Sequence, residues 1–104
     1  MKHLTQARQA ALQALYLCDV GRVDSGVALE TVFAEHLPDA EPAVRAFATT
    51  LVEGVIAERT GLDALIAAHS QHWRIARMAV IDLLVLRIGV WELQHQPDTP
   101  PAVV

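Results

Sequence analysis

Apolar residues recur at every third or fourth position along the first twenty residues, with polar residues between them. Such spacing places the apolar side chains on one face of an α-helix, so it predicts a helix over residues 4–20. Thr5 is a candidate N-cap, and Gly21, directly after the helix, is a candidate stop. The apolar positions are Leu4, Ala7, Ala11, Leu12, Ala14, Leu15 and Cys18.

Two further helices are predicted in the first half of the chain. A polar break with Ser25 as a candidate N-cap precedes a helix over residues 27–37, which Pro38 terminates. A third helix begins near Pro42, because proline suits the first helical turn. Gly54 within it costs about 1 kcal/mol relative to alanine, and we expect close packing against another helix to explain this glycine.

The second half of the chain predicts two more helices. Thr60 and Gly61 indicate a break or kink, after which Leu62, Leu65 and Ile66 mark a short fourth helix. A polar connection leads to a fifth helix over residues 74–94, whose apolar residues point in nearly every direction. A helix of this kind is either a buried central helix or one that lacks its partners.

These elements predict an all-α fold, a bundle of about five helices with short loops and no strands. The 104 residues suit a single domain, and an apolar fraction of 53% is too high for a disordered segment. The longest apolar stretch, residues 78–93, is interrupted by Asp82, Arg87 and Glu92 and is too short and too charged to span a bilayer. With a single cysteine and no signal-peptide pattern, we expect a cytoplasmic protein.

Charge is unevenly distributed along the chain. The formal net charge is −4, and the first acid in the sequence is Asp19. The N-terminal end instead carries Lys2, His3 and Arg8, with Gln9 beside them. Cations and the free N–H groups of a helix N-terminus both favour phosphate, so this end is a candidate nucleic-acid contact. Two full cations are common on any protein surface, so charge alone leaves an ordinary solvated helix end as the alternative.

The remaining reactive residue types favour structural roles. The sequence holds no nucleophile elbow, phosphate loop or dinucleotide fingerprint, which argues against an enzyme. His69 and His72 have the spacing of two metal ligands, but no third ligand type lies near them, so we expect solvent-facing histidines and no metal. Cys18 shares a helical face with apolar residues and is expected to be buried. Trp73 and Trp91 are expected to anchor the core or an interface.

Two charged residues interrupt the otherwise apolar fifth helix. Asp82 and Arg87 are five positions apart and therefore do not face each other. If they are buried, each needs a partner. Alternatively, they mark the one wet stripe of the helix or a protein-binding edge, and the sequence leaves these alternatives open.

The order of residues in two stretches resembles the NusB family. Residues 7–16 read ARQAALQALY, which is similar to the opening helix of that family, A-R-x-x-A-L-Q-A-L-Y. Residues 86–93 read LRIGVWEL, which resembles the family signature L-R-hydrophobic-x-x-aromatic-E-L, and residues 98–104 resemble the P-x-x-V loop that follows it. The segment LVEGV at residues 51–55 also fits. The resemblance covers the whole chain.

This resemblance implies a fold and a function. NusB proteins are all-helical, non-enzymatic and free of cofactors, with two small helical subdomains that would correspond here to a three-helix part, residues 1–60, and residues 61–104. They pair with the ribosomal protein NusE, bind the single-stranded boxA element of nascent RNA, and help RNA polymerase in its antitermination complex on ribosomal RNA operons. Carried over by position, the RNA-facing residues would be Lys2, His3, Arg8, Gln9, Pro100 and Pro101, and the NusE-facing residues would be Tyr16 and Asp82.

The sequence departs from the family pattern in three places. Residues 4–6 stand where family members usually carry arginines, and Leu83, followed by Leu84, stands where an arginine is common, which we expect to add apolar surface. The chain also stops before the last helices of the family, so the C-terminal subdomain would be incomplete. We therefore expect exposed apolar surface on the fifth helix, or a homodimer that buries it.

Two other functions remain open at this point. The first is an RNA-binding domain similar to the one fused to some ribosomal RNA cytosine methyltransferases, which shares the NusB-like fold and a related signature. The second is a protein-interaction or oligomerisation module without an RNA role, which the acidic net charge favours. A salt-dependent affinity for RNA would argue against the second, because phosphate contacts release counterions.

Overall fold

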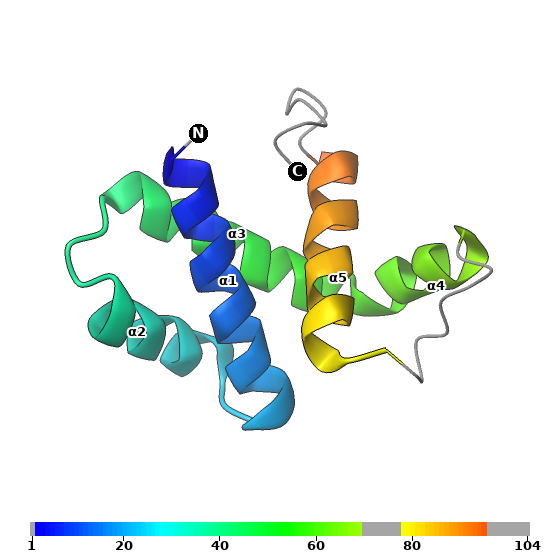
Figure 1. The fold of residues 1–104 in the computed structure, drawn as a ribbon, viewed down its shortest axis with the longest axis horizontal. Helices are drawn as coiled ribbons and strands as arrows, with labels where there is room; N and C mark the ends of the chain where they lie inside the picture. The colour runs from blue at the N-terminus through cyan, green and yellow to red at the C-terminus, as the bar shows by residue number, and fades with distance from the viewer. Residues whose placement is uncertain (1, 70–77, 96–104) are drawn as a thin grey trace. The chain divides into compact units, whose positions relative to one another are not determined.

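The computed structural model describes residues 2–69 and 78–95, and the regular structure in these ranges is helical throughout (Figure 1). The helices are α1 (Lys2–Val20), α2 (Ser25–His36), α3 (Pro42–Ala57), α4 (Arg59–His69) and α5 (Val80–His95). The predicted all-α fold of five helices is confirmed, with no strand in the described ranges. None of the described helices is long and apolar enough to cross a membrane.

The first two helices begin earlier than the sequence predicts. α1 starts at Lys2, so Thr5 lies inside the helix and is not its N-cap. The cap of α2 is Asp24 rather than Ser25: its backbone is extended, and its Oδ2 accepts a hydrogen bond from the N–H of Gly26 at 3.0 Å. A short carboxylate side chain can reach the second N–H of a helix in this way, so it satisfies a donor that the helix leaves unpaired.

The junction between α3 and α4 lies at Glu58, and the predicted break at Thr60 and Gly61 is wrong. The N–H of Glu58 donates to the carbonyl of Gly54 at 3.0 Å, and the N–H of Leu62 donates to the carbonyl of Glu58 at 2.9 Å. Bonds of this i→i+4 type carry the helical pattern up to and away from the junction. The helical preference of the flanking residues therefore outweighs the low propensities of one threonine and one glycine.

The fifth helix begins at Val80 rather than Arg74. Met78 and Ala79 precede it, and the carbonyl of Ala79 accepts a hydrogen bond from the N–H of Leu83 at 3.1 Å. Ala79 is thus the N-cap position of α5. The predicted helical residues 74–77 lie outside the described residues, and so does Trp73.

The chain forms two compact units, residues 1–53 and residues 54–104, and the boundary between them falls inside α3. Each unit is described by itself below. The division into subdomains at residue 60 stays a prediction.

In the first unit, α1 packs against α2 through a face made of small residues. Four alanines of α1 are buried, namely Ala7, Ala10, Ala11 and Ala14. Two larger residues of α2, Val32 and Phe33, are also buried. Small residues on one helix and larger ones on the other can fill the space between two helices.

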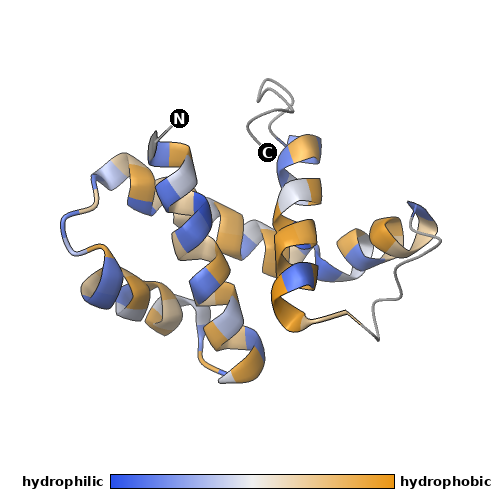
Figure 2. Cartoon of the chain, viewed as in Figure 1, coloured by the Kyte–Doolittle hydropathy of each residue, from blue (hydrophilic) through white to orange (hydrophobic). Residues whose placement is uncertain are grey.

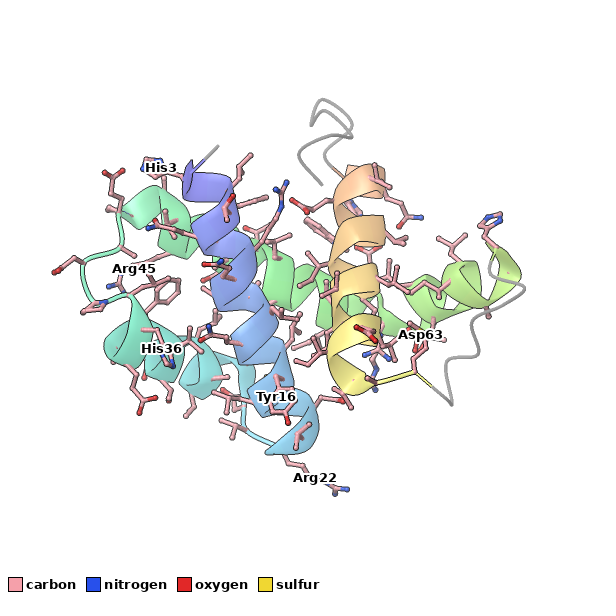
Figure 3. All side chains as sticks on the ribbon, viewed as in Figure 1. His3, Tyr16, Arg22, His36, Arg45 and Asp63 are labelled. Carbon is pink, nitrogen blue, oxygen red and sulfur yellow. The ribbon has the colours of Figure 1, made fainter. Side chains whose placement is uncertain are left out.

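Arg45 on α3 fixes the loop between α2 and α3. Its Nη2 donates to the carbonyl of Pro38 at 3.0 Å, and its Nε donates to the carbonyl of Ala40 at 3.3 Å. The guanidinium also lies 4.8 Å from the centre of the Phe33 ring, within the range of a cation–π contact. One side chain therefore satisfies loop carbonyls and covers a core aromatic ring (Figure 3).

In the second unit, α4 packs against α5, and a buried ion pair joins them. Arg87, only 8% exposed, donates from Nε to Oδ1 of Asp63 at 2.7 Å and from Nη2 to Oδ2 at 2.9 Å. This two-pronged geometry satisfies a cation that would be costly to bury alone. The open question about the two charges of the fifth helix is answered: Arg87 is buried and paired with Asp63, whereas Asp82 is exposed.

Gly54 on α3 lies directly against the indole of Trp91 on α5. A Cβ placed on Gly54 would overlap the Cε2, Cζ2 and Nε1 atoms of that ring. The expectation that close helix packing explains this glycine is therefore confirmed. Trp91 is also buried, as predicted.

Replacing the two glycines of this region should have opposite effects on stability. Gly54→Ala should lower the free energy of unfolding by about 1–3 kcal/mol, because the new methyl group overpacks the indole contact. Gly61→Ala in α4 meets nothing within 4 Å, so it should raise that free energy by about 0.5–1 kcal/mol through helix propensity. Urea unfolding followed by circular dichroism measures both. An unchanged stability of Gly54→Ala would contradict the packing.

The Arg87–Asp63 pair should show energetic coupling. Arg87→Met and Asp63→Ala should each cost about 1.5–3 kcal/mol of unfolding free energy, the range for hydrogen bonds that involve a charged group. The double variant should cost less than the sum of the two, because neither charge is then left without its counterpart. Urea titrations of the three variants complete the cycle, and strictly additive costs would argue that the pair contributes nothing.

Candidate nucleic-acid and protein interfaces

The basic end of the chain is the first turn of α1. Lys2 is the first residue of the helix. The His3 imidazole is exposed, and its Nε2 lies 3.4 Å from Oε2 of Glu41, just before α3. Sequence reasoning missed this acid because Glu41 is far from His3 along the chain. The positive end thus has a carboxylate beside it, which reduces its attraction for phosphate.

The two other predicted RNA-facing residues of α1 differ in exposure. Gln9 is exposed, whereas Arg8 is half-buried. Of the two full cations expected at this end, Arg8 is therefore only partly available to a ligand. Pro100 and Pro101 lie outside the described residues.

An exposed stripe runs along α1 from this end toward the opposite one. Gln9, Gln13, Tyr16 and Val20 follow each other at spacings of three or four, and all four are exposed. We call them the α1 stripe. Its first half is polar and its second half is apolar, with Tyr16 40% and Val20 53% exposed. Figure 3 shows His3 and Tyr16 near opposite ends of α1, about 20 Å apart at 1.5 Å per residue.

Asp82, the second predicted partner-facing residue, is exposed in the first turn of α5. An acid at this position is favoured by the helix dipole whether or not a partner binds. Large apolar side chains of the same helix are exposed as well: Val80, Ile81, Val85 and Leu86 lie within about one turn of Asp82, and Leu93 lies further along the helix. Figure 2 shows how much of α5 is hydrophobic.

A groove of about 840 Å³ lies between α4 and α5. Its walls are apolar, and His69, Asp82 and Gln94 supply its polar atoms. The exposed apolar surface expected on the fifth helix is thus confirmed, and the alternative of a helix buried on all sides is wrong. One prediction about this surface fails: Leu84 is buried in the core and adds no apolar surface, while Leu83 is half-buried.

No metal centre is found in the part of the chain that the structure describes, where no three histidine, cysteine or carboxylate side chains come together. His69 is exposed, as predicted, and His72 lies outside the described residues. Cys18 is half-buried rather than buried. Burial raises the pKa of its thiol, and the negative charges of Asp24 and Asp19 raise it further.

Comparison with known proteins gives a consistent family assignment. A sequence model of the NusB family matches residues 5–104. The transcription antitermination protein NusB of Geotalea uraniireducens is 40% identical to this chain, over 99% of the chain and 75% of the relative. That of Myxococcus xanthus is 43% identical over 92% and 70%, and that of a Nocardioides species is 37% identical over 99% and 73%. No solved structure matches the chain.

The raised pKa of Cys18 predicts slow alkylation. The pH midpoint of its reaction with iodoacetamide should lie above that of the same cysteine in urea, because only the thiolate reacts. Asp19→Asn should move the midpoint of the folded protein downward, since it removes one of the charges that disfavour the thiolate. Rates measured by mass spectrometry between pH 7 and 10 would test this, and equal midpoints in folded and unfolded protein would contradict it.

Proposed function

The chain belongs to the NusB family, and on that premise we propose that it is a transcription antitermination factor that binds RNA and a protein partner. The observation that carries this proposal is the match of residues 5–104 to the family, together with relatives about 40% identical that are named for antitermination. Such a function rests on binding, and the protein is not an enzyme. It would act where bacterial transcription takes place, in the cytoplasm.

The proposed RNA ligand is single-stranded and boxA-like, and it would contact the N-terminal end of α1. The absence of acids among the first eighteen residues and the exposure of His3 and Gln9 support this end of the helix. Lys2 and Arg8 would supply the cations, and Pro100 and Pro101 would complete the contact. Because Glu41 lies beside His3, we expect a moderate affinity that a protein partner would need to reinforce.

The proposed protein partner is the ribosomal protein NusE within the RNA polymerase antitermination complex. Two exposed places support a protein contact. The apolar half of the α1 stripe presents Tyr16, an aromatic residue of the type enriched at interfaces. On the other unit, Asp82 lies among exposed apolar side chains of α5. An acid within an apolar patch favours a partner that offers a cation at the same place.

A homodimer through α5 is the proposed state of the protein when no partner is present. The exposed Val85, Leu86 and Leu93 support it, because contiguous apolar surface in water favours association. Sedimentation at increasing concentration tests this point. A monomer at high concentration that also fails to bind a hydrophobic dye would overturn it.

The first experiment titrates labelled boxA RNA with this chain, alone and with NusE, at two salt concentrations. Binding that is tighter with NusE and weaker at higher salt would support both parts of the proposal, since phosphate contacts release counterions. Absence of RNA binding in every condition would refute the RNA role. Binding to NusE without RNA would then favour a protein-interaction module.

Two charge-matched variants locate the RNA contact. Lys2→Gln removes a cation at the proposed end, and Arg22→Gln removes one beyond the other end of α1 (Figure 3). Lys2→Gln should reduce the slope of log affinity against log salt by about 0.7, the value of one phosphate contact in single strands. Arg22→Gln should leave the slope unchanged. Equal effects of the two variants would mean that RNA responds only to net charge.

A further inference from the structure

Two side chains at the end of α5, Trp91 and His95, converge on one carboxylate, that of Glu58. Trp91 donates from Nε1 to Oε2 of Glu58 at 3.0 Å. The His95 Nε2 lies 2.9 Å from Oε1 and 2.8 Å from Oε2 of the same residue. The imidazole of His95 also stacks on the indole of Trp91, with ring centres 4.5 Å apart and planes 27° from parallel. Each of the three contacts reinforces the other two geometrically.

The position of Glu58 in the chain determines which helices this cluster connects. Glu58 is the single residue between the end of α3 and the start of α4, so its carboxylate belongs to the junction of two helices. Trp91 and His95 are one turn apart on α5, and Arg87, a further turn back, binds Asp63 of α4. The polar atoms of one face of α5 therefore all bind α4 or its junction with α3.

The cluster is accessible to protons although it borders the core. The Glu58 and His95 side chains are 42% and 40% exposed, whereas Trp91 is buried. Two other charged residues lie close to Glu58 or His95 in the sequence. Arg59 follows Glu58 on α4, and on α5 Glu92 precedes His95 by one turn but is buried and 1% exposed. The ion pair that His95 makes is with Glu58.

We propose that Glu58, Trp91 and His95 form a pH-sensitive latch that holds the last turn of α5 to the α3–α4 junction. The latch is tight while Glu58 is ionised, because the hydrogen bonds from Trp91 and His95 are then made to a charged acceptor. It weakens on acidification, as the carboxylate gains a proton. It requires neither RNA nor a protein partner.

The contacts of Glu58 lower the pKa of its carboxyl group. The hydrogen bond from His95 is the largest influence on the pKa of Glu58 and lowers it. Burial is the next largest and raises it, while the hydrogen bond from Trp91 and the charge of His95 lower it, so that the net shift is downward. A carboxyl whose pKa is lower in the folded state stabilises that state above its ordinary pKa. This contribution is lost as the pH falls through the lowered value.

The test follows the indole Nε1–H signal of Trp91 by NMR from pH 3 to pH 9 in the full chain. A hydrogen bond to an ionised carboxylate shifts this proton downfield. The proposal predicts that the downfield shift is lost in a single acid limb, whose midpoint lies below the ordinary pKa of a glutamate side chain.

Three variants assign this limb. Glu58→Gln should abolish it, because it removes the ionisable acceptor while keeping the side-chain shape. His95→Gln should move the midpoint of the limb upward, since it removes the main cause of the low Glu58 pKa. His69→Gln, at the exposed end of α4, is the matched control and should leave the limb unchanged. Circular dichroism verifies that each variant remains helical.

Two results would overturn the latch. If the Trp91 indole signal in Glu58→Gln follows the same pH profile as the original protein, the carboxylate is not its acceptor. If His95→Gln leaves the midpoint of the acid limb unchanged, the hydrogen bond from His95 is not what lowers the pKa of Glu58. The original protein provides a test that needs no variant, because a flat profile between pH 3 and pH 9 is incompatible with the proposal.

Discussion

The indole of Trp91 determines how the second unit is assembled, because it contacts α3 and the α3–α4 junction from a position on α5. Its ring lies where any side chain at Gly54 would be, so this approach of α3 and α5 requires glycine at that point. Its N–H reaches Glu58, and Arg87, one turn away, pairs with Asp63. A large apolar ring thus supplies the packing, while hydrogen bonds at its edge and one turn away set the orientation of the helix. Packing and polar contacts both involve the same face of α5, so together they specify one orientation of this helix.

Periodicity was sufficient to predict the number and kind of the helices, but their ends depended on interactions that periodicity does not describe. The cap at Asp24 and the junction at Glu58 are decided by single hydrogen bonds. Gly54 was correctly interpreted as a close-packing position, although its partner, Trp91, is far away in sequence and could not be identified. Arg87 illustrates the same limit: it was visible as a charge in an apolar helix, and only the fold shows that it pairs with Asp63.

The candidate interfaces also combine features that the sequence predicts with features that only the fold reveals. The positive N-terminal end was visible because charge is read directly from sequence, whereas the neighbouring Glu41 comes from another part of the chain. The motif resemblance selected Tyr16 and Asp82, and the structure finds both exposed. That Tyr16 continues a stripe with Gln9 is a matter of helical geometry and could have been derived from spacing alone. On α5, the apolar excess that the sequence left as either core or exposed surface divides into a core face and a face open to water.

The buried alanine face of α1 limits which substitutions the protein can accept during evolution. An alanine in a tight helix contact has one methyl group, so substitution can hardly remove volume there, and almost any replacement adds it. Ala7, Ala10, Ala11 and Ala14 therefore tolerate variation in one direction only, toward glycine. The larger residues of α2, such as Val32 and Phe33, can be exchanged for others of similar volume. Drift in the first unit should accordingly be concentrated on α2, while the separation of the two helix axes remains constant because the alanines of α1 set it.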